Sequence, residues 1–211
     1  MKMKKARFLL ATLVCAVVAM GVGYAWWTDS IGVTETAAAG HMEVIFVDGS
    51  NTNGTSAYVD ATITKTDDKT YTCSFTNLYP GAKARVDLKA INSGTIPVKF
   101  NNAAITVTGS SDLRDNIDAQ VCYCKLDTAG DVVVGSEGGT ELVLLKNLQD
   151  AINGEADLKA LEFATGEYLA LGSPTDDDSS ILLQVKDNAP DGIENETLTF
   201  DLELNWKQFN E

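Results

Sequence analysis

Apolar and polar residues alternate along much of this 211-residue chain, and this pattern limits the possible folds more than any other feature. In the clearest run, near the C-terminus, every second residue is apolar: Leu198, Phe200, Leu202, Leu204 and Trp206. Shorter runs of the same kind lie at residues 71–75, 86–90, 96–100 and 105–107. A period of two is typical of strands that bury one face, and turn-forming pairs separate the runs. The pattern predicts a mainly β fold, a jelly-roll-like two-sheet sandwich.

One stretch departs from this alternation. Between residues 141 and 162, apolar residues recur at the spacing of a helix, and Asn153-Gly154 would divide the stretch into two helices. We therefore expect a single β-sandwich domain over residues 41–211, with a short helical insertion at about residues 141–162.

The N-terminus has the three parts of a secretory signal peptide. Four basic residues precede an uncharged apolar run at residues 8–22, and the small residues Gly23 and Ala25 follow. The run is shorter than the roughly 20 apolar residues that span a bilayer. We expect cleavage between Ala25 and Trp26, which would remove residues 1–25 and release the rest outside the cell. Membrane contact is then expected only through the uncleaved signal.

The charge of the mature chain excludes some partners. All 30 acidic residues lie after residue 25, whereas four of the 16 basic residues lie before it. The mature chain would therefore carry 12 basic against 30 acidic residues, a net charge of −18. A polyanion of this strength repels nucleic acid and anionic membranes, so we expect neither as a partner.

Three cysteines remain after cleavage, because Cys15 lies in the signal peptide. Cys122 and Cys124 would point to the same face of a strand, since one residue separates them. A disulfide from Cys73 to either of them is possible, and buried free thiols are the alternative.

The histidine motifs of common hydrolases are missing from the sequence, whereas its many carboxylates do not discriminate between functions. His41 is the only histidine, whereas the zinc-protease motif needs two histidines one helical turn apart. We therefore expect no enzyme activity, no cofactor and no metal site. Residues 176–178 are three aspartates, which leave calcium binding open as an alternative because calcium prefers oxygen ligands.

Three segments together resemble one family. Gly-Tyr-Ala-Trp-Trp-Thr-Asp-Ser at residues 23–30 resembles the cleavage region of substrates of the SipW-type signal peptidase. Residues 75–95 look like the pattern Leu-x-Pro-Gly, strand, Asn-Ser-Gly-Thr, with turns at Pro80, Gly81, Asn92 and Gly94 that frame one strand. Residues 198–206 resemble the closing strand of the same family. This family is the TasA-like biofilm matrix proteins of Gram-positive bacteria, which include camelysin and the clostridial BsaA group.

The resemblance implies a secreted structural protein of the extracellular matrix or cell surface. Members of the family polymerise non-covalently into fibres by donor-strand exchange, in which the processed N-terminus of one subunit completes a sheet of the next. Residues 26–40 would then be a donor segment and linker, with Trp26, Trp27, Ile31 and Val33 in the donor strand. The expected partners are other copies of this chain and a SipW-type signal peptidase, and other matrix proteins stay open as partners.

Two other functions remain as alternatives. The camelysin name would suggest a cell-surface metalloprotease, which the missing zinc motif opposes. The second alternative is a carbohydrate-binding or adhesive module, because jelly rolls are common in lectins. Such a module would need exposed aromatic side chains, such as Tyr58, Tyr79 or Tyr168.

Overall fold

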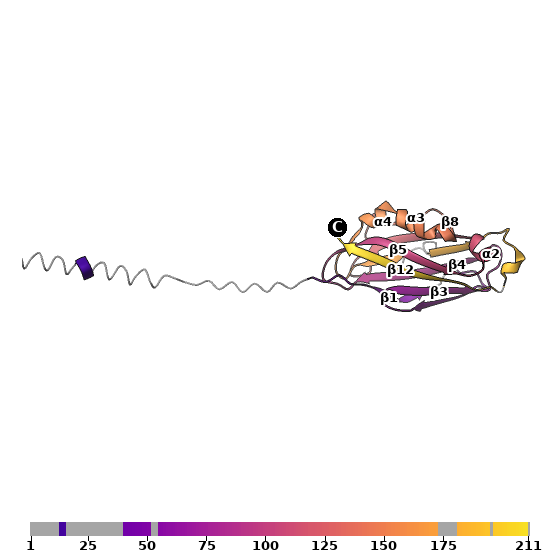
Figure 1. Ribbon diagram of the computed structural model, residues 1–211, viewed down its shortest axis with the longest axis horizontal. Coiled ribbons are helices and arrows are strands. Elements are labelled where there is room, and N and C mark those ends of the chain that lie inside the picture. The colour runs from indigo at the N-terminus through magenta and orange to yellow at the C-terminus, as the bar shows by residue number, and fades with distance from the viewer. Residues whose placement is uncertain (1–12, 16–39, 52–54, 173–180, 195, 211) are drawn as a thin grey trace, which may run out of the picture. The chain divides into compact units, whose positions relative to one another are not determined.

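A computed structural model describes residues 13–15, 40–51, 55–172, 181–194 and 196–210. The chain divides into two compact units, of which Gly40–Glu211 is a two-sheet β sandwich (Figure 1). The mainly β, jelly-roll-like fold is therefore confirmed. In the other unit, Met1–Ala39, only residues 13–15 are described, so the cleavage site and the donor strand lie outside the described residues. No described helix has both the length and the apolar character needed to cross a membrane.

The first sheet contains one strand position that two short strands share. Its order is β1 (Val44–Asn51), β4 (Lys83–Asn92), β10 (Tyr168–Leu171) and β6 (Ile117–Leu126). β11 (Ile181–Val185) pairs with the same two neighbours further along, and Ile181 lies opposite Val86 and Val121. Two short strands, β7 (Gly138–Gly139) and β8 (Val143–Leu144), pair with β6.

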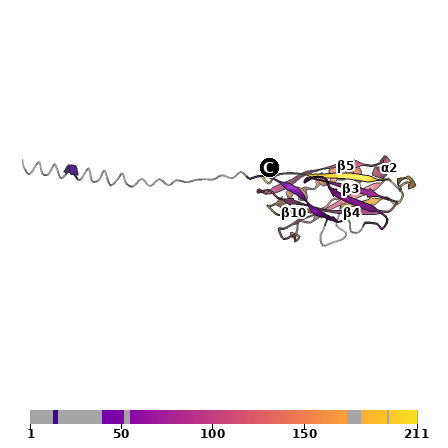
Figure 2. The ribbon, with the colours of Figure 1, turned by 90° about the horizontal axis from the view of Figure 1, so that it is seen from below.

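The second sheet has the order β2 (Asp60–Lys65), β3 (Thr70–Thr76), β12 (Leu198–Gln208), β5 (Val98–Thr108) and β9 (Glu162–Phe163). Its strands run along the length of the sandwich (Figure 2). Asn205 of β12 lies opposite Asn102, whereas Trp206 lies opposite Phe100, so Asn101 is an extra residue in β5. This bulge explains why the apolar positions of β5 change from even numbers to odd numbers after residue 100.

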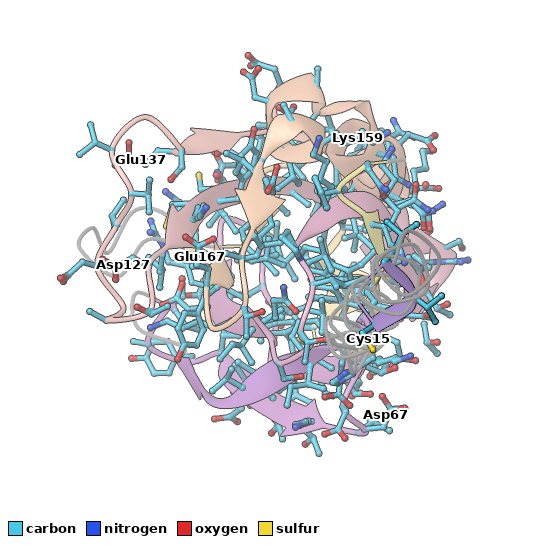
Figure 3. All side chains as sticks on the ribbon, turned by 90° about the vertical axis from the view of Figure 1, so that its left-hand side faces the viewer. Cys15, Asp67, Asp127, Glu137, Lys159 and Glu167 are labelled. Carbon is cyan, nitrogen blue, oxygen red and sulfur yellow. The ribbon has the colours of Figure 1, made fainter. Side chains whose placement is uncertain are left out.

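The core lies between the sheets and follows the predicted alternation. The inward residues of β3 and β4 are no more than 3% exposed: Tyr71, Cys73, Phe75, Val86, Leu88 and Ala90. In the middle of β12, Phe200 stacks on Phe75 with 5.9 Å between the ring centres. Figure 3 looks along the strands and shows side chains filling the space between the two sheets.

The predicted helical insertion is present, but it is shorter than residues 141–162, because Val143–Leu144 and Glu162–Phe163 pair as strands. It consists of a short 3-10 helix, η1 (Leu145–Asn147), followed by α3 (Leu148–Gly154) and α4 (Ala156–Ala160). A further short helix, α2 (Ser111–Asp115), was not expected from the sequence. It begins where the Ser110 hydroxyl accepts a hydrogen bond from the Leu113 N–H at 3.1 Å. Another 3-10 turn, η2 (Asp191–Ile193), precedes β12.

The disulfide that the cysteine count left open is not formed. Cys73 and Cys124 are free thiols, so Cys73 forms no bridge to either of the other two cysteines. Cys73 is buried in the main core, whereas Cys124 packs with Leu126 and Ala170 in a separate small cluster. Tyr123, the neighbour of Cys124, faces the main core, so Cys124 lies on the outer face of the first sheet. Cys73 and Cys124 are therefore on different sides of that sheet.

We expect the thiols of Cys73 and Cys124 to be unreactive in the folded protein. Burial raises the pKa of Cys73 to about 12 and that of Cys124 to about 11, so both stay protonated at pH 8. Because the thiolate is the reactive form, iodoacetamide should modify them only after unfolding, as mass spectrometry would show. Rapid modification of either one in the folded protein would contradict this assignment. Both pKa values are raised, so the free energy of unfolding should fall as the pH rises above about 9.

Candidate functional site

The helical insertion covers the outer edge of β5. The Asn153 side chain bonds both backbone groups of Ala103, accepting from its N–H at 2.7 Å and donating to its carbonyl at 3.0 Å. The Gln149 Oε1 accepts from the Ile105 N–H at 2.9 Å. An open strand edge attracts other strands, so these two amides of α3 protect β5 from strand addition.

The segment that follows β6 folds back along that strand and covers its outer edge. The Thr140 N–H donates to the Val121 carbonyl at 2.9 Å, and the Thr140 hydroxyl accepts from the Val121 N–H at 3.1 Å. The Ser136 hydroxyl accepts from the Lys125 N–H at 3.0 Å. Between them lies Gly138, where any Cβ atom would collide with the ring of Tyr123. β6 is therefore also closed to another strand.

The edge of β12 that faces β3 is only partly paired. Figures 1 and 3 place α3 and α4 on one side, and β1, β3 and the turn at Asp67 on the other. On one edge, β12 pairs with β5 up to Gln208. On the other edge, it pairs with β3 only up to Glu203. Among the described residues, no strand lies beside that edge from residue 204 to residue 208. The position is open to a strand that continues the line of β3.

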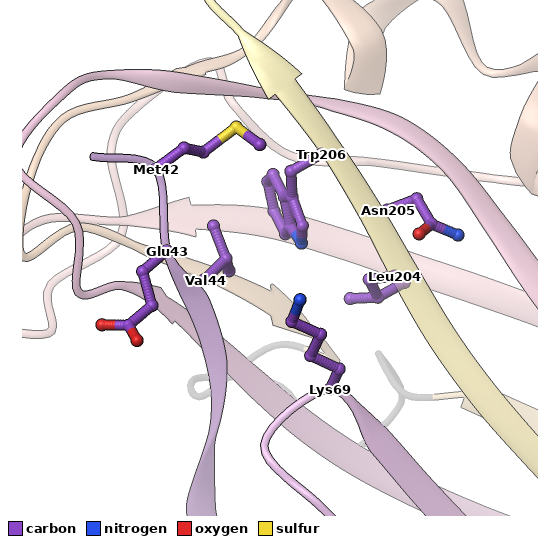
Figure 4. Close-up of a pocket in the computed structure, with 7 residues that line it drawn as sticks. All are labelled: Met42, Glu43, Val44, Lys69, Leu204, Asn205 and Trp206. Carbon is purple, nitrogen blue, oxygen red and sulfur yellow. The ribbon is translucent and has the colours of Figure 1, made fainter. Parts of the chain in front are cut away.

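A groove of about 320 Å³ lies beside this open stretch (Figure 4). We term it the β12 groove and define it by its lining residues: Met42, Glu43, Val44, Lys69, Leu204, Asn205 and Trp206. They come from the start of β1, the turn between β2 and β3, and the end of β12. A shallower depression continues past Phe46 to Asp68, where the Phe46 N–H donates to the Asp68 carbonyl at 2.8 Å.

The β12 groove has both polar and apolar walls, and its aromatic wall is packed on the core. The Trp206 indole packs edge to face on Phe163 and on Phe100, with 5.4 Å and 6.1 Å between the ring centres. Met42 is 44% exposed and adds an apolar side chain to the same wall. The groove can therefore bury apolar side chains, while the open backbone of β12 can pair with a strand. In the described part of the chain, no group of three or more His, Cys, Asp or Glu is placed to hold a metal ion.

The turn between β4 and β5 holds the chain immediately before β1. The Gly94 N–H donates to the Glu43 carbonyl at 3.0 Å, and the Thr95 N–H donates to the His41 carbonyl at 2.9 Å. In return, the His41 N–H donates to the Thr95 hydroxyl at 2.9 Å. Because Met42 and Glu43 also line the β12 groove, the domain begins at the mouth of that groove.

Asn92 supports this turn from within. Its side chain is 1% exposed, and its Oδ1 accepts from the Gly94 N–H at 3.0 Å. Its Nδ2 donates to the carbonyls of Ile96 at 2.9 Å and Phe163 at 3.0 Å. Gly94 must be glycine because a Cβ atom would lie 2.6 Å from both the Glu43 nitrogen and the His41 oxygen. Asn92 and Gly94 therefore anchor the chain start, in addition to forming the predicted turn.

The other predicted site residues lie elsewhere. Pro80 and Gly81 form the turn from β3 to β4, in which the Ala82 N–H donates to the Tyr79 carbonyl at 2.9 Å and Gly81 has a φ of +81°. Neither residue lines the β12 groove. His41 is exposed, and residues 176–178 lie outside the described residues.

The three tyrosines considered for glycan binding belong to different parts of the structure. Tyr58 is 78% exposed, Tyr79 packs against the main core, and Tyr168 packs against the small cluster around Cys124. The described residues therefore give these tyrosines no common cluster.

Sequence reasoning missed Lys69 and Asn153, and it treated Trp206 only as a core residue. The role of Trp206 depends on the pairing of β12 with β3 ending before its pairing with β5 does, and no local sequence pattern indicates that difference.

No protein-family model matches the chain, and no curated protein matches it.

Proposed function

We propose that this protein is a secreted structural subunit of extracellular matrix fibres, which polymerises non-covalently by strand donation from its processed N-terminus. The observation that carries the proposal is the open stretch of β12 beside a groove with an aromatic and aliphatic wall. The edges of β5 and β6, in contrast, are covered by side chains and by backbone pairing. A strand supplied by another copy would complete the second sheet beside the end of β12, where the described residues leave the edge unpaired.

Residues 26–36 have the composition that this position requires. In an extended segment, Trp27, Ile31 and Val33 share one face, and Trp26 adds a second indole on the other. Burying an indole removes about 150–250 Å² from water, which corresponds to about 4–6 kcal/mol before the costs of association. This gain would oppose the repulsion between subunits that each carry a net charge of −18 after cleavage.

The linker, residues 37–40, would span about 13 Å when extended. It would join the donor segment to the start of the domain, where Met42 and Glu43 line the β12 groove. Before cleavage the signal would hold this segment at the membrane, which makes the peptidase the step that permits assembly.

Deleting residues 26–36 should abolish fibres without unfolding the domain. The mature chain and the deleted chain would be compared by electron microscopy, by size-exclusion chromatography and by thermal unfolding. We expect fibres from the first, and only folded monomers from the second. Fibres of unchanged yield from the deleted chain would refute the proposal.

A matched pair of variants tests which face of the segment matters. Replacing Trp27, Ile31 and Val33 with serine should act like the deletion. Replacing Thr28, Ser30 and Thr34 with alanine should leave fibres intact, because these residues lie on the opposite face of an extended strand.

A further inference from the structure

Lys69 is the only basic side chain among the described residues that line the β12 groove. Figure 4 shows its ammonium end directed toward Trp206 and Val44, inside the groove. No described residue forms an ion pair with it. The neighbouring carboxylate of Asp68 is already paired with the Lys65 ammonium at 2.8 Å. Lys69 is exposed and therefore presents a positive charge, without an ion-pair partner among the described residues, to whatever fills the groove.

The other charged residue of the groove does not neutralise Lys69. The Glu43 carboxylate accepts a hydrogen bond from the Ser93 hydroxyl at 2.9 Å, and its side chain points away from Trp206 in Figure 4. The turn that carries Lys69 is itself well held: the Lys69 N–H donates to the Asp67 carboxylate at 2.7 Å, and the Thr66 N–H donates to the Thr70 carbonyl at 3.0 Å. The hydrogen bonds of this turn therefore fix the backbone position of Lys69.

The donor segment contains the complementary charge. Asp29 lies between Trp27 and Ile31 on the same face of an extended strand, and residues 26–36 contain no basic residue. A carboxylate desolvated against the Trp206, Val44 and Leu204 wall of the groove without a partner is unfavourable. Asp29 would therefore weaken binding of the donor strand unless the groove supplies a cation for its carboxylate.

We propose that Lys69 recognises Asp29 of residues 26–36 from a second copy of this chain. The inference rests on the proposed function and names the contact that fixes the register of the donor strand. A slip of two residues would bring Trp27 or Ile31 to the ammonium and leave Asp29 among apolar side chains. The ion pair therefore favours one register of the donor strand beside β12, whereas apolar contacts alone would allow several registers.

Reversing the charge of Asp29 or of Lys69 tests this contact, because the two variants should assemble together but not alone. Asp29→Lys has a basic donor and a basic groove, and Lys69→Asp has an acidic donor and an acidic groove. Each variant alone should need at least about a tenfold higher protein concentration to form fibres, because like charges now meet. An equimolar mixture should polymerise at nearly the concentration of the parent. Its fibres should contain the two variants in alternation, which mass spectrometry of cross-linked neighbours would show.

The controls use the same kind of change at sites outside the contact. Ser30→Lys places a cation on the opposite face of the donor segment, and Lys83→Asp changes an exposed lysine that does not line the β12 groove. Both controls should polymerise alone at the concentration of the parent. Thermal unfolding of every variant checks the fold, and the milder pair Asp29→Asn and Lys69→Met tests the contact if a reversed variant is unstable.

The outcomes separate this inference from the proposed function. If deleting residues 26–36 abolishes fibres but both reversals polymerise normally, the contact between Asp29 and Lys69 is wrong and strand donation stands. If the deletion leaves fibres unchanged, strand donation itself is wrong. If a chain with both reversals polymerises but the mixture of single variants does not, each groove holds its own segment, and recognition between copies is overturned.

Discussion

Replacing Asn92 with alanine should lower the free energy of unfolding by about 3–5 kcal/mol, as measured by urea denaturation. The side chain is 1% exposed and makes three hydrogen bonds, to Gly94, Ile96 and Phe163. The substitution leaves the Ile96 and Phe163 carbonyls without the side-chain donor, whereas the Gly94 N–H keeps its bond to the Glu43 carbonyl. Each unsatisfied group costs about 1–3 kcal/mol, which is why a single amide has so large an effect.

The same change should also release the start of the domain. Without Asn92 the Gly94 turn loses its internal support, so hydrogen exchange should become faster at the backbone N–H groups of Gly94 and Thr95, which bond to the chain before β1. Asn116→Ala is the matched control, because its amide makes one exposed hydrogen bond, to the Asp112 carbonyl. A loss of less than about 1 kcal/mol is expected there. Equal losses for both variants would show that Asn92 is not a special support.

The strands could be predicted from the sequence because burial of a strand face is a local property. Tyr71, Cys73 and Phe75 alternate with polar residues, and the observed core follows that alternation. The bulge at Asn101 could not be predicted in the same way, because it is defined by the partner strand β12. The helical insertion was also visible in its local spacing, and α3 does end at Gly154.

Less of the candidate site than of the fold could be predicted from the sequence. Asn153 was correctly interpreted as part of a helix end, but its bonds to Ala103 depend on how α3 packs on β5. Lys69 follows two aspartates in a turn, a pattern that indicates only a solvated loop. Its importance comes from the position of β12 relative to β3, which is a property of the whole sandwich.

Replacing Trp206 with alanine should affect both stability and assembly. The indole packs edge to face on Phe100 and Phe163, so its removal should lower the free energy of unfolding by about 3 kcal/mol in urea denaturation. It also removes a wall of the β12 groove. Under the proposed function, fibres should then fail to form even at a temperature where the variant is fully folded.

A second core variant separates these two effects. Phe200→Ala should cost about 3–5 kcal/mol, because Phe200 is 1% exposed and stacks on Phe75. Phe200 does not line the β12 groove, so its variant should still form fibres while it is folded. Trp206→Phe keeps an aromatic ring in the groove and should retain most of the assembly. If Phe200→Ala and Trp206→Ala lost fibres equally, the loss would follow from reduced stability, and the groove would have no role of its own in binding the donor strand.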